Sequence, residues 1–260
     1  MNARPHGLSQ ALILARYTLV EALKSRLGMV GLAVCAAGLG VAAFIDALAL
    51  TDAAGIRNTV LAALLRASAV FLAATFVITA MVRDENDRGL ELLLSLPLSR
   101  AAYLGGRWAG FALAGSLLAL ADTAVLLALG AGAPAVAWGL ALMLELWIVV
   151  SLALACVLTF RHVVSALAAV AAFYILARIM TALIAVTASP VAPVDAWSFR
   201  LSAAMLRVLA ALMPRLDLYA PSHWLGADAA PELAPLLLQT PVTIALLLLI
   251  AYVDLARRNR

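Results

Sequence analysis

The sequence contains little charge and almost no lysine. Of its 260 residues, 12% are charged and 66% are hydrophobic, whereas soluble domains are about 25% charged and about 45–50% apolar. An ordinary soluble globule is therefore excluded. Lys24 is the only lysine, and no glycine-rich loop precedes it. A nucleotide-binding P-loop consists of a glycine-rich loop followed by a lysine. Since the sequence has no such motif, any ATP-driven role requires a separate ATPase.

Residues suited to metal or covalent chemistry are also scarce. Cys35 and Cys156 lie inside apolar runs without a ligand spacing, so we interpret both as buried hydrophobic residues. The histidines lie outside the middle of these runs, at His6, His162 and His223. A hydrolase acting within the membrane would need a serine and a histidine that meet at depth, and Ser116 has no such partner. We predict no catalytic residue, no metal ligand, no cofactor bound by this chain and no nucleic-acid partner.

The sequence is instead built from long apolar runs. Crossing a bilayer takes roughly 20 residues, and six runs are suited to do so: 27–50, 59–82, 108–130, 136–160, 163–188 and 236–253. They predict an all-α polytopic membrane protein that forms a single transmembrane domain over residues 1–260.

Basic residues are distributed unequally between the predicted loops. If the N-terminus is inside, only Arg57, Arg200, Arg207 and Arg215 lie in external segments, and most of the other basic residues lie in cytoplasmic ones. Cytoplasmic loops are enriched in Lys and Arg, so this orientation is the favoured one. Both termini are then cytoplasmic, which agrees with an even number of spans in a bacterial inner membrane.

Two shorter segments have an amphipathic helical pattern. In 9–26, one face is apolar, and Thr18, Glu21 and Ser25 lie opposite. We expect this elbow helix to lie along the inner membrane surface; the alternative is a cytoplasmic extension of the first span. In the external loop over 189–235, Ser198 can cap a helix that stops at Pro214. At about 15 residues that helix is too short to span, so we expect it at the outer surface.

The cytoplasmic loop over 83–107 begins with a dense run of charges. It continues as a short leucine-rich helix that Pro97 ends, and Ser99 can cap the helix leading into the third span. A short helix with exposed leucines and flanking carboxylates suits the groove of a partner protein. It suits the membrane surface without a partner equally well, so the residues alone leave both interpretations open.

The same loop resembles the coupling region of ABC-2 type transporter permeases. The matching residues are Glu85, Gly89, Leu93, Leu94, Pro97, Ser99, Arg100 and Tyr103. Leu90 stands where the family has a threonine, and Gly106-Arg107 stands in place of a Gly-Lys pair. Two more stretches, 15–27 and 212–219, are similar to the copper-enzyme-maturation branch of that family, which includes the permease of the nitrous-oxide-reductase maturation transporter.

The resemblance implies a transporter of two permease chains and two ATPase chains, and it favours export over import. It implies that ATP and Mg²⁺ bind to the partner ATPase and that the chain pairs with a second copy of itself. The residues expected to couple to the ATPase are Glu85, Asp87, Gly89, Leu93, Leu94, Pro97 and Arg100. The external loop is the place where we would expect a periplasmic partner.

Five ionisable residues lie within the predicted spans: Asp46, Arg66, Asp122, Glu145 and Arg178. At 1.5 Å per residue all five fall about 6–15 Å below the outer face, which predicts one polar layer in the outer leaflet. Charges at such depth are costly unless they pair or face a wet cavity. We expect Arg66 to pair with Asp46, and Arg178 with Glu145 or Asp122. The alternative is a polar lining for an outward-facing cavity.

Three functions are compatible with these features. The first is an ABC-2 permease driven by a separate ATPase, which the loop favours. The second is a secondary transporter that works alone, and the third is a membrane scaffold without transport. The missing phosphate-binding loop fits all three, and no cluster of thiol, thioether or imidazole groups indicates a copper substrate.

Overall fold

The computed structural model describes residues 6–48, 53–86, 99–160, 162–187, 213–225 and 233–257, together with Trp197, Leu201 and residues 204–206. Within these ranges the chain is helical and contains no strand. The long helices are α1 (His6–Lys24), α2 (Arg26–Leu48), α3 (Ala53–Asn86), α5 (Arg100–Ala128), α6 (Gly132–Phe160), α7 (Val163–Thr187) and α9 (Ala234–Arg257), and the short 3₁₀ turns are η1 (Leu216–Leu218) and η2 (Ser222–Leu225).

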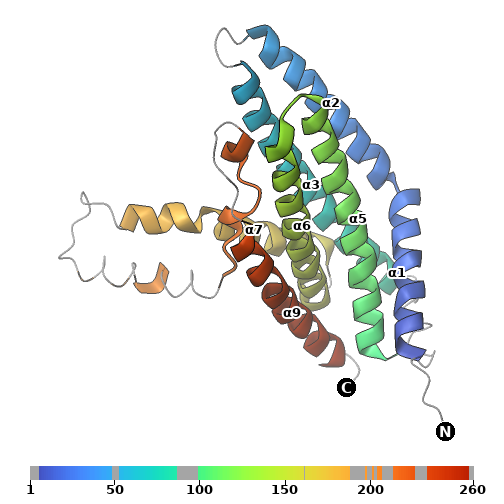
Figure 1. Cartoon of the computed structure of the whole chain (residues 1–260). Coiled ribbons are helices and arrows are strands. Elements are labelled where there is room, and N and C mark those ends of the chain that lie inside the picture. Colours follow the sequence, from blue (N-terminus) through green and yellow to red (C-terminus); the bar gives the residue numbers. More distant parts are fainter. Residues whose placement is uncertain are drawn as a thin grey trace.

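Six of these helices are long and apolar enough to cross a membrane. They are α2, α3, α5, α6, α7 and α9, which confirms the six predicted spans. The start of α1 and the end of α9 lie at the same end of the bundle (Figure 1). We call it the terminal end and the other the distal end. Arg100 Nη1 donates to the carbonyl of Ala256 at 3.3 Å there. An even number of spans is thus confirmed, whereas the cytoplasmic side of this end stays a prediction.

Helix α6 lies at the centre of the bundle. In an apolar stretch of 18 residues of α6, 78% of the residues are buried, whereas the buried share of the corresponding stretch is 17% in α2 and 22% in α9. Two tryptophans join it to α5: Trp108 Nε1 donates to Ser151 Oγ at 2.8 Å, and Trp147 Nε1 donates to Ser116 Oγ at 3.0 Å. Ser116 is therefore a hydrogen-bond partner between helices. The turn from α5 to α6 uses Gly130 and Gly132, both at positive φ, where glycine has no steric cost.

The elbow helix is confirmed as α1, but its expected orientation is wrong. It stands alongside the first half of α5 (Figure 1) and meets α2 at a break at Ser25. Close approach is possible because α5 has glycines at the contact. A Cβ on Gly106 would lie 2.7 Å from the carbonyl oxygen of Ala11, and one on Gly110 would lie 2.5 Å from Thr18 Cβ. A helix aligned with a spanning helix cannot lie flat on the membrane surface.

Helices α3 and α5 extend past their predicted spans at the terminal end. The predicted runs end at 82 and begin at 108, whereas α3 continues to Asn86 and α5 begins at Arg100. Ser99 caps α5 as predicted, since its Oγ accepts from the amide of Ala102 at 3.2 Å. The predicted loop helix between them and most of the predicted external helix lie outside the described residues.

Residues 213–225, which belong to the predicted external loop, pack into the bundle, and their place on the external side stays a prediction. Leu216, Tyr219 and Ala220 are fully buried, and Tyr219 is one of the largest buried side chains. The two turns η1 and η2 pack against α3, α6 and α7. We call 213–225 the inserted segment. It carries too little apolar length to span, so the sequence gives no local sign that it enters the bundle.

Candidate functional site

A buried cluster of charges joins α1, α3 and α5 at the terminal end. Its centre is Arg107 on α5, whose side chain is 1% exposed. Nη1 donates to Thr18 Oγ1 at 3.0 Å and to Glu21 Oε2 at 3.1 Å, both on α1. Nη2 forms an ion pair with Asp84 near the end of α3. We call these four residues the Arg107 cluster.

Two contacts extend the Arg107 cluster. Arg83, next to Asp84 on α3, forms an ion pair with Glu21 and thus ties α3 to α1 a second time. The guanidinium of Arg107 also lies 5.5 Å from the ring centre of Phe111, one turn further along α5, in a cation–π arrangement. The face of α1 that carries Thr18 and Glu21 therefore faces this arginine.

The Arg107 cluster lies directly next to the predicted coupling loop. Glu85 is in the last turn of α3 and Arg100 is the first residue of α5, so the two helices that enter and leave this loop are the ones that Arg107 joins. The other predicted coupling residues lie outside the described part of the chain: Asp87, Gly89, Leu93, Leu94 and Pro97. Their contact with an ATPase stays a prediction.

A second buried cluster lies deeper in the bundle, around Glu145 on α6. Glu145 is fully buried, and its Oε1 accepts from Arg178 Nη1 at 3.0 Å and from Tyr174 Oη at 2.8 Å, both on α7. The predicted pair of Arg178 with Glu145 is thus confirmed, and the alternative pair with Asp122 is not the one formed. We call Glu145, Tyr174, Arg178 and Arg66 the Glu145 cluster.

The arginines of the Glu145 cluster hold the inserted segment by its backbone. Arg178 Nη1 donates to the carbonyls of Leu216 at 2.5 Å and Tyr219 at 2.8 Å. Arg66 Nη1 donates to the carbonyl of Ala220 at 2.8 Å. Buried carbonyls outside regular structure need such donors, because water is excluded there. This role explains why two arginines lie at this depth.

Ala220 takes an unusual backbone conformation at this point. Its φ is 42°, a left-handed value that is uncommon for residues other than glycine. Its carbonyl also accepts from Trp138 Nε1 of α6 at 3.0 Å. Tyr219 beside it donates to or accepts from Thr240 Oγ1 of α9 at 2.9 Å. The inserted segment is thereby bound to α3, α6, α7 and α9.

The predicted pair of Arg66 with Asp46 is wrong. Asp46 on α2 pairs with Arg57 at the start of α3, with Nη1 2.8 Å from Oδ2. Arg57 Nη2 also donates to the carbonyl of Leu129 at 2.7 Å. Arg66 and Asp46 do not meet, because a similar depth in the membrane does not fix the direction in which each side chain leaves its helix. Asp122 lies in a third place, where its Oδ1 accepts from Cys35 Sγ at 3.7 Å.

The five predicted intramembrane charges form three separate groups of contacts, and their common depth in the outer leaflet stays a prediction. Glu145, Arg178 and Arg66 were predictable from the sequence, whereas the backbone carbonyls that bind the two arginines were not. Arg107 entered the prediction only as a match to a family motif, without Glu21 and Asp84 as its partners. The sequence signal that could have indicated this cluster is the polar stripe formed by Thr18 and Glu21 in 9–26. If that stripe is buried, its side chains need a polar partner.

In the described residues no group of three or more His, Cys, Asp or Glu side chains could hold a metal ion. Comparisons with the models of known protein families and with curated proteins find no match for this chain.

Proposed function

We propose that this chain is the transmembrane permease subunit of an ABC-2 type exporter in a bacterial inner membrane. In this proposal a separate ATPase binds ATP and Mg²⁺ and docks on the cytoplasmic face, and two permease chains work with two ATPase chains. The six membrane-spanning helices fit a transporter component. The motif of the loop between α3 and α5 supports the ATPase partner.

The observation that carries the proposal is the position of the Arg107 cluster. A force applied to the loop over 87–98 acts first on the end of α3 and the start of α5. Arg107 joins these two ends to each other and to α1 through Glu21 and Asp84. Buried charge pairs are costly to separate, so the three helices are expected to move together when an ATPase displaces the loop.

Helix α3 offers a route from the loop to the interior of the bundle. Asp84 belongs to the Arg107 cluster and Arg66, on the same helix, belongs to the Glu145 cluster. At 1.5 Å per residue they lie about 27 Å apart along the helix axis. Because Arg66 holds the carbonyl of Ala220, a shift of α3 along its axis would pull on the inserted segment. We propose that this segment closes the distal end until α3 moves.

The proposal is tested by purification with the ATPase. The tagged chain is co-expressed with an ABC ATPase from the same genome, and the amount of ATPase recovered is measured. Glu85→Ala and Leu93→Ala in the coupling region are compared with Asp254→Ala, a carboxylate of α9 at the same end of the bundle that bonds Thr159. Recovery that falls with the first two changes and persists with the third supports the proposal. If the intact chain recovers no ATPase, a stand-alone carrier or scaffold becomes the better account.

A further inference from the structure

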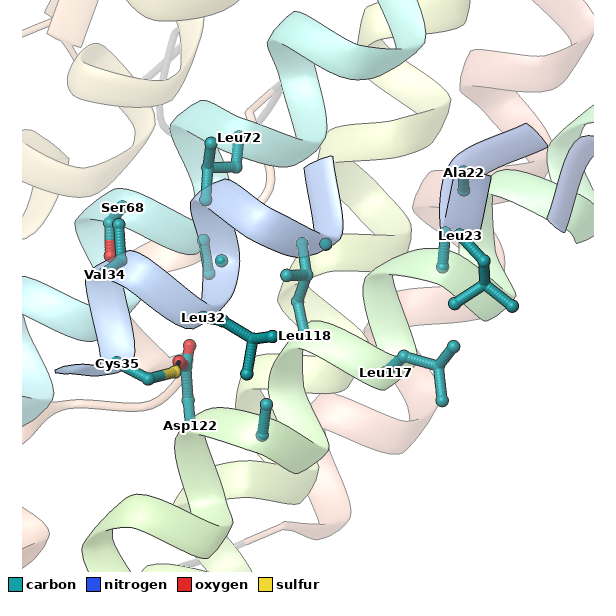
Figure 2. Close-up of a pocket in the computed structure, with 15 residues that line it drawn as sticks. Ala22, Leu23, Leu32, Val34, Cys35, Ser68, Leu72, Leu117, Leu118 and Asp122 are labelled. Atoms are coloured by element: carbon teal, nitrogen blue, oxygen red, sulfur yellow. Dashed lines mark hydrogen bonds between the residues drawn. The ribbon is translucent and has the colours of Figure 1, made fainter. Parts of the chain in front are cut away.

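A cavity of about 140 Å³ is lined by residues of α1, α2, α3 and α5 (Figure 2). It belongs neither to the Arg107 cluster nor to the Glu145 cluster. Its walls are mostly apolar and include Leu32, Leu72, Leu117 and Leu118. Leu32 and Leu117 are exposed. Since the surface around them belongs to membrane-spanning helices, we expect the cavity to open toward lipid.

Asp122 is the single acidic residue that lines this cavity. Its side chain reaches the cavity from α5 beside Cys35 of α2 (Figure 2). The residue is 5% exposed. One carboxyl oxygen accepts a weak hydrogen bond from Cys35, and the other, Oδ2, has no hydrogen-bond partner among the described residues. Asp122 is thus a buried acid whose capacity to accept hydrogen bonds is mostly unused.

The surroundings of Asp122 contrast with those of Glu145. Glu145 receives donors from Arg178 and Tyr174. Asp122 forms no ion pair with any described residue, and the lining of its cavity contains no Lys, Arg or His. A carboxylate in an apolar membrane site is costly unless a cation compensates it. No described residue supplies such a cation here, so a cationic ligand would compensate this carboxylate.

We propose that this cavity binds lipophilic cations: organic ammonium compounds with one positive centre and an apolar body. The ammonium group would lie against the Asp122 carboxylate, and the apolar body would lie along the leucines toward the opening. The space exists because glycine and alanine line it. A Cβ on Gly28 would meet only one atom, a backbone oxygen 4.0 Å away, so a larger side chain at that position could extend into the cavity.

The test measures the binding of hexylammonium, whose N–H groups can donate to Asp122, to the purified chain by titration calorimetry, without any ATPase. Hexanol serves as the neutral comparison. Asp122→Asn keeps the shape of the side chain and removes its charge, whereas Asp46→Asn is a matched control because Asp46 pairs with Arg57 elsewhere. Gly28→Leu is expected to occupy part of the cavity. Gly40→Leu is its control on the same helix, since a Cβ there meets nothing within 4 Å and Gly40 does not line the cavity.

We expect Asp122→Asn and Gly28→Leu each to weaken binding about tenfold or more, and both controls to bind as the unchanged chain does. Hexanol should bind far more weakly than the cation. The proposal is overturned if the unchanged chain does not bind the cation, if hexanol binds equally well, or if Asp122→Asn binds normally. If Asp122→Asn does not fold, the comparison of Gly28→Leu with Gly40→Leu tests the proposal, which is overturned if both bind the cation equally well. Failure here leaves the ATPase partnership untouched, because no ATPase takes part.

Discussion

Arg107 of α5 and Glu21 of α1 form a buried ion pair, with 3.1 Å between Nη1 and Oε2. This pair fixes the first helix of the chain to the third predicted span, next to the loop that we propose as the ATPase contact. Removing Arg107 would leave Asp84 without its cation and Glu21 with Arg83 alone. Such a change lowers the free energy of unfolding far more than the removal of a surface charge does.

We predict that Arg107→Gln lowers the free energy of unfolding by about 3–5 kcal/mol, because Glu21 and Asp84 then lose their shared cation. Denaturation of the purified chain in detergent measures this. Arg215→Gln is the control, since Arg215 is 56% exposed in its pair with Asp217, and we expect a cost below about 1 kcal/mol. Adding Glu21→Gln to Arg107→Gln should cost less than the sum of the two; simple additivity would contradict the pairing.

The glycines of α5 provide a second prediction. Gly110→Ala places a Cβ 2.5 Å from Thr18 Cβ and 2.7 Å from the carbonyl oxygen of Ala15, so α1 must move away. We expect a loss of about 1–3 kcal/mol in the free energy of unfolding. Gly105→Ala meets nothing within 4 Å and should stabilise the helix by about 0.5–1 kcal/mol. Equal melting temperatures for the two variants would show that α1 does not pack here.

A third prediction concerns the Glu145 cluster. Arg178→Gln removes the cation that holds Glu145 and two carbonyls of the inserted segment. We expect a loss of about 3–5 kcal/mol. The double variant with Glu145→Gln should be more stable than Arg178→Gln alone, because no uncompensated carboxylate remains. Denaturation of the three variants in parallel measures this, and a double variant less stable than Arg178→Gln would contradict the arrangement.

The separate positions of Asp46 and Arg66 give a fourth prediction. Asp46→Ala and Arg66→Ala should change stability additively, within about 0.5 kcal/mol, because the two side chains share no partner. Asp46→Ala and Arg57→Ala should not be additive, since these residues form an ion pair. Two double-mutant cycles measured on the same preparation test both statements. Coupling between Asp46 and Arg66 would restore the pairing that the sequence suggested.

The spans were predictable because length and hydropathy are local properties. The six runs match α2, α3, α5, α6, α7 and α9, and Ser99 caps α5 as its sequence indicates. The pair of Arg178 with Glu145 was one of two predicted alternatives. Depth along a helix limited the choice of partners, but it could not decide the partner of Arg66, which depends on helix rotation.

Other features depend on contacts between distant segments. The polar stripe of α1 looks like a water-facing surface until Arg107, far along the chain, is placed against it. The inserted segment looks like an external loop because it is short and contains Pro214 and Pro221. It can be buried only because Arg66, Arg178 and Trp138, from three helices, donate hydrogen bonds to its carbonyls. These long-range contacts cannot be predicted from the local sequence.

The central claim is that this chain is driven by an ATPase, and the most direct measurement is ATP hydrolysis in reconstituted vesicles. The ATPase is assayed alone, with the unchanged chain and with Arg107→Gln. The account predicts that the chain alters the hydrolysis rate and that Arg107→Gln abolishes this effect while the two proteins still purify together. A hydrolysis rate that is the same with and without the chain would contradict the claim.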